Sequence, residues 1–198
     1  NLANLNTTGY KTETAEFKSL LYQTLQTRST NNAGDENPVG AKDGLVSRTA
    51  AITSQFTQGN LNPSESPFAV AIEGSGFFKV RTENGEIQYT RDGNFAVSPV
   101  EGGTMLCTSD GKPVLDQYNN TIIIPAGLNA TTIGIATDGR ITLNSANDEQ
   151  VNLVRTDANG NALYNVQIGV VQFNNPAGLE KSSGNCYRQT VASGTPME

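Results

Sequence analysis

Residues 68–97 read FAVAIEGSGFFKVRTENGEIQYTRDGNFAV, and this stretch decides the fold. It alternates short, β-prone apolar runs with the pairs Asn84-Gly85 and Asp92-Gly93. Asn-Gly and Asp-Gly between such runs are strong hairpin signals, because a type I′ turn needs positive φ at both central residues. The stretch therefore predicts an antiparallel β-meander.

A two-residue turn at Asn84-Gly85 would fix the register of the first hairpin. Counted outward from that turn, Val80 faces Tyr89 on one side of the ladder, and polar residues face one another on the other side. An antiparallel sheet with one face in water shows this alternation. The apolar face that we expect in the core consists of Phe78, Val80, Ile87 and Tyr89.

Further turn pairs separate short apolar runs along the rest of the chain, at Asp110-Gly111, Asp138-Gly139 and Asn159-Gly160. Counting outward from the Asn159-Gly160 turn places Arg155 opposite Tyr164. Many short strands joined by hairpins are typical of sandwiches and barrels. The predicted fold class is mainly β, an antiparallel, hairpin-rich β-sandwich or barrel-like domain with an N-terminal arm.

The N-terminal region has a different character. Apolar residues at helical spacing, among them Phe17 and Leu25, predict a short amphipathic helix between Thr12 and Leu25. The spacing fits packing on its own domain and packing on a neighbouring subunit equally well. Residues 26–44 contain almost no apolar side chain, so we expect a long polar loop there.

The alternation of Leu45–Phe56 predicts a strand that leads into the meander. The predicted organisation is therefore an arm and polar loop over residues 1–44 and a β domain over residues 45–173. Residues 174–198 are expected to complete the interface region with the arm. Within that tail, Pro176 after Asn175 predicts a single capped helical turn.

Composition narrows the function classes. The chain has 198 residues and a net charge of −6, with its 13 Lys and Arg scattered singly, which argues against a nucleic-acid partner. It contains no histidine, the commonest general base and metal ligand. No carboxylate pair has the pattern of an acid and a base. We therefore predict no enzyme, no catalytic residue, no cofactor, no metal site and no small-molecule substrate.

One segment has the start of a calcium-loop spacing. Asp157, Asn159 and Asn161 stand at alternate positions, but the sixth position is Ala162 and the twelfth is Ile168. A calcium loop needs Gly and a bidentate Glu at these two places. A plain hairpin turn is the favoured interpretation.

The two cysteines, Cys107 and Cys186, leave three alternatives open. They are two buried thiols, a single disulfide between distant strands, or a reactive thiol. Two buried thiols are the favoured interpretation, because a single pair of distant cysteines is weak evidence for a disulfide.

Several patches, in order along the chain, resemble the central part of bacterial flagellar rod and hook proteins, which are axial proteins of the basal body. The distal rod branch is the most similar. The patches are NLANLNTTGYK (1–11), FKSLLY (17–22), FTQGNL (56–61), AVAIEGSGFF (69–78), YTRDGNF (89–95) and the Asn, Pro, Gly and Leu pattern of 173–196.

This resemblance implies a structural axial subunit of the rod that is exported to the basal body of the flagellum. Such a subunit polymerises helically and transmits torque from motor to hook. Its expected partners are further copies of itself, neighbouring rod and hook subunits, and bushing-ring proteins where an outer membrane is present. The resemblance also implies terminal helices that flank residues 1–198.

Two alternatives stay open at this point. Within the same family, the chain could be a hook or proximal rod subunit. In a different class, it could be a secreted β-sandwich module for adhesion or carbohydrate binding, for which aromatic residues should cluster on an exposed face.

The candidate residues for subunit contacts come from the arm, the polar loop and the start of the tail. They are Phe17, Leu20, Leu21, Tyr22, Asn31, Asp35, Asn37, Asn175, Pro176 and Leu179.

Overall fold

The chain folds into two compact units. One combines Asn1–Thr12 with Phe56–Glu198, and the other is Glu13–Gln55. The residues that the computed structural model describes are 7–19, 47–126, 133–144 and 150–197.

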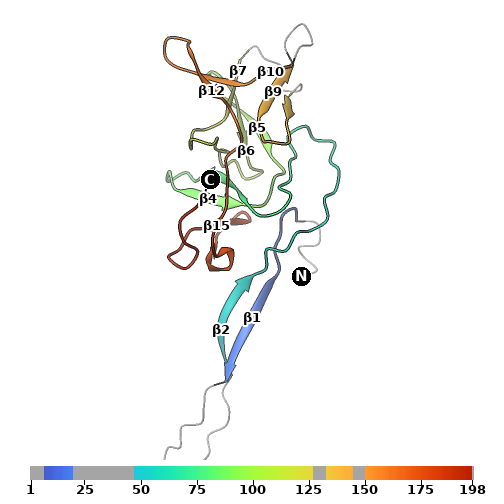
Figure 1. The fold of residues 1–198 in the computed structure, drawn as a ribbon, viewed down its shortest axis with the longest axis vertical. Helices are drawn as coiled ribbons and strands as arrows, with labels where there is room; N and C mark the ends of the chain where they lie inside the picture. The colour runs from blue at the N-terminus through green and yellow to red at the C-terminus, as the bar shows by residue number, and fades with distance from the viewer. Residues whose placement is uncertain (1–6, 20–46, 127–132, 145–149, 198) are drawn as a thin grey trace, which may run out of the picture. The chain divides into compact units, whose positions relative to one another are not determined.

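All the strands pair in an antiparallel manner (Figure 1). In chain order they are β1 (Glu13–Ser19), β2 (Ser47–Ser54), β3 (Phe77–Arg81), β4 (Ile87–Thr90), β5 (Ala96–Val100), β6 (Gly103–Cys107), β7 (Ile123–Pro125), β8 (Ile133–Ile135), β9 (Ile141–Asn144), β10 (Gln150–Asn152), β11 (Val154–Thr156), β12 (Ala162–Asn165), β13 (Val170–Val171), β14 (Glu180–Lys181) and β15 (Cys186–Arg188).

The smaller unit contains a two-stranded ribbon of β1 and β2, which runs from the pair Glu13 and Ser54 to the pair Ser19 and Ser47. A helix was predicted over residues 12–25. Residues 13–19 form a strand instead, which contradicts that prediction, and residues 20–25 lie outside the described residues. Residues 13–19, ETAEFKS, also alternate polar and apolar side chains, and the helical pattern hid this period of two. A short isolated helix is marginal in water, whereas pairing with β2 supplies hydrogen-bond partners for the backbone. The strand predicted within Leu45–Phe56 is confirmed by β2.

In the described part of the chain, the larger unit holds four sheets. The central one has five strands in the order β13-β3-β4-β15-β14, and β5-β6-β7, β10-β9-β8 and β11-β12 form the others. The mainly β, antiparallel and hairpin-rich character predicted from the sequence is thus confirmed. The tail adds one 3-10 turn, Pro176–Gly178, with Pro at its start as predicted, but the Asn175 side chain does not cap it. Among the described residues, no helix is long and apolar enough to span a membrane.

The register of the β3–β4 hairpin differs by one residue from the prediction, with Val80 opposite Gln88. The turn holds three residues rather than two, because Thr82 N–H donates to Glu86 O and Gly85 N–H donates to Thr82 O, both at 2.9 Å. Only Gly85 takes a positive φ, 84°, whereas a type I′ turn would require one at Asn84 as well. The turn is therefore a type I turn closed by a left-handed glycine, which leaves a bulge.

The same three-residue turn recurs in the larger unit. Each time, a backbone pair closes the loop and the glycine that follows Asn or Asp has a φ of 81–85°. The four loops lie between Thr82 and Glu86, Thr108 and Lys112, Ala136 and Arg140, and Asp157 and Asn161. The sequence placed these turns correctly, and it missed their length.

The Asp92-Gly93 pair is not a hairpin turn. Gly93 does not take a positive φ, and its carbonyl accepts a 2.9 Å hydrogen bond from Val70 N–H. A Cβ at Gly93 would overlap the Val70 carbonyl. The glycine is needed here because two backbones meet closely.

The hairpin of β11 and β12 shows how two deviations cancel. A three-residue loop shifts the pairing by one position, and a bulge between Arg155 and Thr156 shifts it back. The predicted pairing of Arg155 with Tyr164 is therefore confirmed although the turn length was wrong. The hairpin interpretation of the calcium-like spacing is confirmed too, since the Asp157 carboxylate accepts hydrogen bonds from the backbone N–H groups of Asn159 and Asn161.

The central sheet is buried on both faces, which corrects the prediction of one face in water. Neighbouring residues of a strand point to opposite faces, so Phe78 and Val80 enter one cluster while Phe77 and Tyr89 enter another. The larger cluster consists of Phe78, Val80, Phe95, Leu106, Val114, Ile122, Ile124, Ile133, Ile141, Leu143, Leu153, Val166, Ile168 and Cys186. The smaller one consists of Phe77, Tyr89, Val171, Phe173, Leu179 and Tyr187.

Lys79 and Gln88 are buried polar side chains of this sheet, and each donates a hydrogen bond. Lys79 is 3% exposed, and its Nζ donates to Gln117 O at 3.1 Å. Gln88 is equally buried, and its Nε2 donates to Ser182 Oγ at 3.1 Å. Burial without such partners would be unfavourable. Lys79 shares a face with Tyr89 and Gln88 shares the other with Val80, so polar residues are buried on both faces of the sheet.

Both cysteines are free and buried, so the structure selects the first of the three alternatives. Burial is the main cause that raises the pKa of each thiol above its ordinary value. The Lys112 cation, whose Nζ lies 3.6 Å from Cys186 Sγ, opposes that shift without reversing it.

Candidate functional site

The segment 7–11 lies on the body of the larger unit. Gly9 has a φ of 69°, and a Cβ there would stand 2.7 Å from Asp92 N and 2.8 Å from the Arg91 carbonyl. A side chain at this position would therefore be strained by its φ and would clash with backbone. The sequence did not indicate this contact, and the structure shows that Gly9 allows it.

The tail also contacts residues 7–11, through two side chains. Asn185 Nδ2 donates to Thr8 O at 2.9 Å, across 177 positions of sequence. The Lys181 ammonium lies 4.9 Å from the centre of the Tyr10 ring, in a cation–π contact. Residues 7–11 and the tail are thus fastened to each other.

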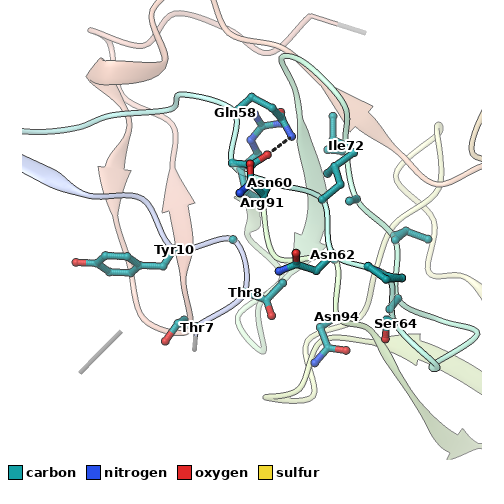
Figure 2. Close-up of a pocket in the computed structure, with 18 of the residues that line it drawn as sticks. Thr7, Thr8, Tyr10, Gln58, Asn60, Asn62, Ser64, Ile72, Arg91 and Asn94 are labelled. Atoms are coloured by element: carbon teal, nitrogen blue, oxygen red, sulfur yellow. Dashed lines mark hydrogen bonds between the residues drawn. The ribbon is translucent and has the colours of Figure 1, made fainter. Parts of the chain in front are cut away.

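A groove of about 770 Å³ opens beside this junction (Figure 2). Its lining comes from residues 7–11, 58–64 and 69–72, and from Arg91, Gly93 and Asn94. Amide and hydroxyl side chains, such as those of Thr8, Asn62 and Asn94, make up much of the wall (Figure 2). The groove exists because segments far apart in the sequence converge on the Arg91–Asn94 stretch.

Two cations line this groove. Lys11 Nζ donates to Thr57 O at 2.7 Å, and burial together with the Arg91 charge lowers the pKa of Lys11. Arg91 Nη2 donates to Gly74 O at 2.7 Å, and its guanidinium lies 5.7 Å from the centre of the Phe77 ring. Burial also lowers the pKa of Arg91. The positive charges of Lys11 and Arg91 therefore lie in a part of the groove lining that is only partly accessible to water.

The start of the tail contains three of the predicted contact residues. Asn175 is exposed, and its Nδ2 donates to Ala192 O at 3.0 Å, while Pro176 opens the 3-10 turn and is half-buried. Leu179 is 8% exposed and belongs to the smaller core cluster. In the single chain Leu179 therefore packs inside its own unit, and the contact role of all three residues stays a prediction.

The other predicted contact residues are not brought into a described site. The backbone of Phe17 lies in β1. Six lie outside the described residues, namely Leu20, Leu21, Tyr22, Asn31, Asp35 and Asn37.

Sequence reasoning missed the groove and its two cations. Lys11 ends the N-terminal signature and Arg91 lies in YTRDGNF, so the resemblance contained both residues without indicating that they meet. Among the described residues, no group of three or more His, Cys, Asp or Glu side chains is arranged to hold a metal ion. What the groove offers chemically is hydrogen bonding and positive charge.

The comparisons with known proteins agree with one another. Residues 71–143 match the family described as the flagellar hook protein FlgE/F/G D1 domain. The flagellar basal-body rod protein FlgG of Buchnera aphidicola subsp. Acyrthosiphon pisum is 36% identical over the whole of this chain, which covers 69% of that relative.

Two further relatives show how far the similarity extends. The FlgG rod protein of Bacillus subtilis is 32% identical over 98% of this chain and 67% of its own length. The flagellar basal-body rod protein FlgF of Caulobacter vibrioides is 36% identical over 79% of this chain and 58% of its own length. The similarity to FlgG proteins thus includes both ends of the chain.

Proposed function

Because the chain belongs to the flagellar basal-body rod protein family, we propose that it is a structural subunit of the rod that polymerises helically and carries torque from motor to hook. The observation that carries this proposal is the match to FlgG rod proteins along the whole chain. The family consists of structural proteins rather than enzymes. Its members belong to the flagellar basal body, and that is the location we assign.

The fold supports a mechanical role. Hydrophobic clusters pack on both faces of the central sheet, and several small antiparallel sheets surround the larger cluster. Close packing resists deformation, as a subunit under torque requires. Of the described aromatic side chains only Tyr118 is largely exposed, at 62%, which does not support a carbohydrate-binding face.

We assign the contacts of this subunit to the arm and the tail. Residues 1–44 and 174–198 would form the interface region, and residues 45–173 the β domain. The partners would be further copies of the chain, the adjoining rod and hook subunits, and bushing rings where an outer membrane exists. The fastening of Thr8 to Asn185 supports a joint role for the arm and the tail.

Deleting the gene in the organism that encodes this chain tests the proposal. We expect cryotomograms of the mutant to show basal bodies with an incomplete rod, without hook or filament, and cells that do not swim. Gold-labelled antibodies on purified basal bodies should mark the straight shaft. Labelling of the curved hook instead would favour the hook alternative, and complete rods in the mutant would refute the proposal.

The polar loop of residues 26–44 has a proposed role of its own, although it lies outside the described residues. Its polar side chains would bond to adjacent subunits and limit sliding between protofilaments. Deleting Thr27–Asp43 in the full-length protein should then give a shaft that bends like a hook. In the matched control, a Gly-Ser segment of equal length replaces Thr27–Asp43, so that the spacing is kept while the original side chains are removed. Straight rods of unchanged stiffness after the deletion would leave the loop without this role.

A further inference from the structure

The groove beside residues 7–11 has two positively charged side chains in its lining, Lys11 and Arg91. Among the described residues of that lining there is no Asp or Glu. Asp92 follows Arg91 in the sequence but does not line the groove, and its carboxylate accepts the Asn94 N–H at 3.0 Å. In a chain of net charge −6, a cationic groove without acids is a distinct local feature.

Both cations are incompletely compensated. Neither takes part in a salt bridge among the described residues. Arg91 Nη1 is buried and has no hydrogen-bond acceptor within the described part of the chain. A buried guanidinium nitrogen without an acceptor is unfavourable, so the Arg91 cation is stabilised by negative charge that comes close to it in the groove. The mutual repulsion of Lys11 and Arg91 would fall at the same time.

We propose that this groove receives the carboxylates of an acidic hairpin turn from a second copy of the chain, namely the β3–β4 turn with Glu83 and Glu86. The inference rests on the proposed polymeric function. Both glutamates are exposed at the turn, and Glu83 is in no salt bridge of the described residues. Glu86 contacts Arg188 in an exposed pair at 3.4 Å, which a better partner can replace. Two carboxylates at a narrow turn match two cations in a groove.

The contact is heterologous, because the turn is not part of the groove lining. A heterologous contact joins one surface to a different surface of the next copy, so it propagates along a filament instead of closing into a dimer. An exposed ion-pair contact is weak by itself and is screened by salt. It sets which copies are neighbours, while other contacts of the polymer supply most of the affinity.

A titration followed by NMR tests the proposal. The chain labelled with ¹⁵N stays dilute, and unlabelled chain is added to about 1 mM, where a weak contact is populated. Amide signals of residues 8–11 and 91–94 should shift with a dissociation constant in roughly the millimolar range. High salt should reduce these shifts severalfold.

The variants assign the shifts to particular side chains. Labelled Lys11→Gln, and unlabelled chain carrying both Glu83→Gln and Glu86→Gln, should each abolish the groove shifts. The control Arg140→Gln removes a cation of the same charge, far from the groove in sequence, and should leave them unchanged. Labelled Lys11→Glu should shift again with unlabelled Glu83→Lys. Signals outside the groove report whether each variant is folded.

Groove shifts that persist with the double glutamine variant would overturn the proposal, as would the absence of any groove shift. Such a result is separate from the gene-deletion experiment. If deletion removes the rod while the groove stays unresponsive, the subunit function stands and the groove contact fails.

Discussion

At the scale of single residues, glycines determine the geometry of the hairpins. The sequence located the Asn-Gly and Asp-Gly pairs but did not reveal the turn length, because a left-handed glycine ends a three-residue loop as readily as it fills a type I′ turn. The difference depends on φ at one residue, Asn84, which the local sequence leaves free. A one-residue change in register reverses the face of every side chain in the strand.

Substitution at the first of these turns separates the two geometries. Gly85→Ala should lower the free energy of unfolding by about 1–2 kcal/mol, because only its positive φ is penalised and a Cβ there meets no atom within 4 Å. Asn84→Ala should change it by less than about 0.5 kcal/mol. Urea denaturation measures both. Equal losses at the two positions would indicate a type I′ turn after all.

The raised pKa values of the two thiols make a second residue-scale prediction. Because the thiolate is the nucleophile, Cys107 and Cys186 should react slowly with an aromatic disulfide reagent at about pH 8 while the chain is folded. Both should react at once in guanidinium. Lys112→Gln removes the cation that lowers the pKa of Cys186 and should not speed its reaction. Fast labelling of the folded chain would contradict the burial of the thiols.

At the scale of elements, the sequence predicted the strands better than their faces. The strand positions follow from β-prone runs between turn signals, which are local features. Burial of the second face depends on Phe173, Leu179 and Tyr187, which come from the tail. No pattern within residues 77–90 indicates that a segment so distant will cover that face. The helical spacing around Phe17 failed for the same reason, because the pairing partner of β1 lies about thirty residues away.

Alanine substitutions in β3 check that both faces are packed. Phe77→Ala and Phe78→Ala should each cost about 3–5 kcal/mol, since the side chains are 2% and 3% exposed. Val170→Ala, at a residue 39% exposed in the same sheet, should cost less than about 1 kcal/mol. Thermal and urea melts supply the comparison. If Phe77→Ala left the free energy of unfolding unchanged, the result would instead favour a sheet with one face exposed to water.

At the scale of the whole molecule, the sequence indicated the family and composition argued against several functions, but neither located a site. The groove joins residues 7–11 to Arg91 and to segments 58–72, and its existence depends on how the chain returns on itself. Lys11 and Arg91 are scattered single cations in the sequence. Only the fold makes them neighbours.

The isolated chain of 198 residues should be a monomer at about 10 µM, because contacts between its β domains are expected to be small and weak. Static light scattering across a concentration series measures this directly. The groove contact agrees with this expectation, since it should form only near millimolar concentration. A stable oligomer whose mass does not change on dilution would contradict both statements.

The recurring three-residue turns have a consequence for the rate at which the chain regains its structure. Each closes between residues four positions apart, whereas the link from Gln88 to Ser182 spans 94. Hairpins form in about 1–10 µs, and distant pairings come later because their loop-closure entropy is larger. A chain that starts unfolded would therefore form its turns first, and the contacts with the tail would form later. In stopped-flow refolding, Gly85→Ala should slow the folding limb, and Phe173→Ala should mainly speed unfolding.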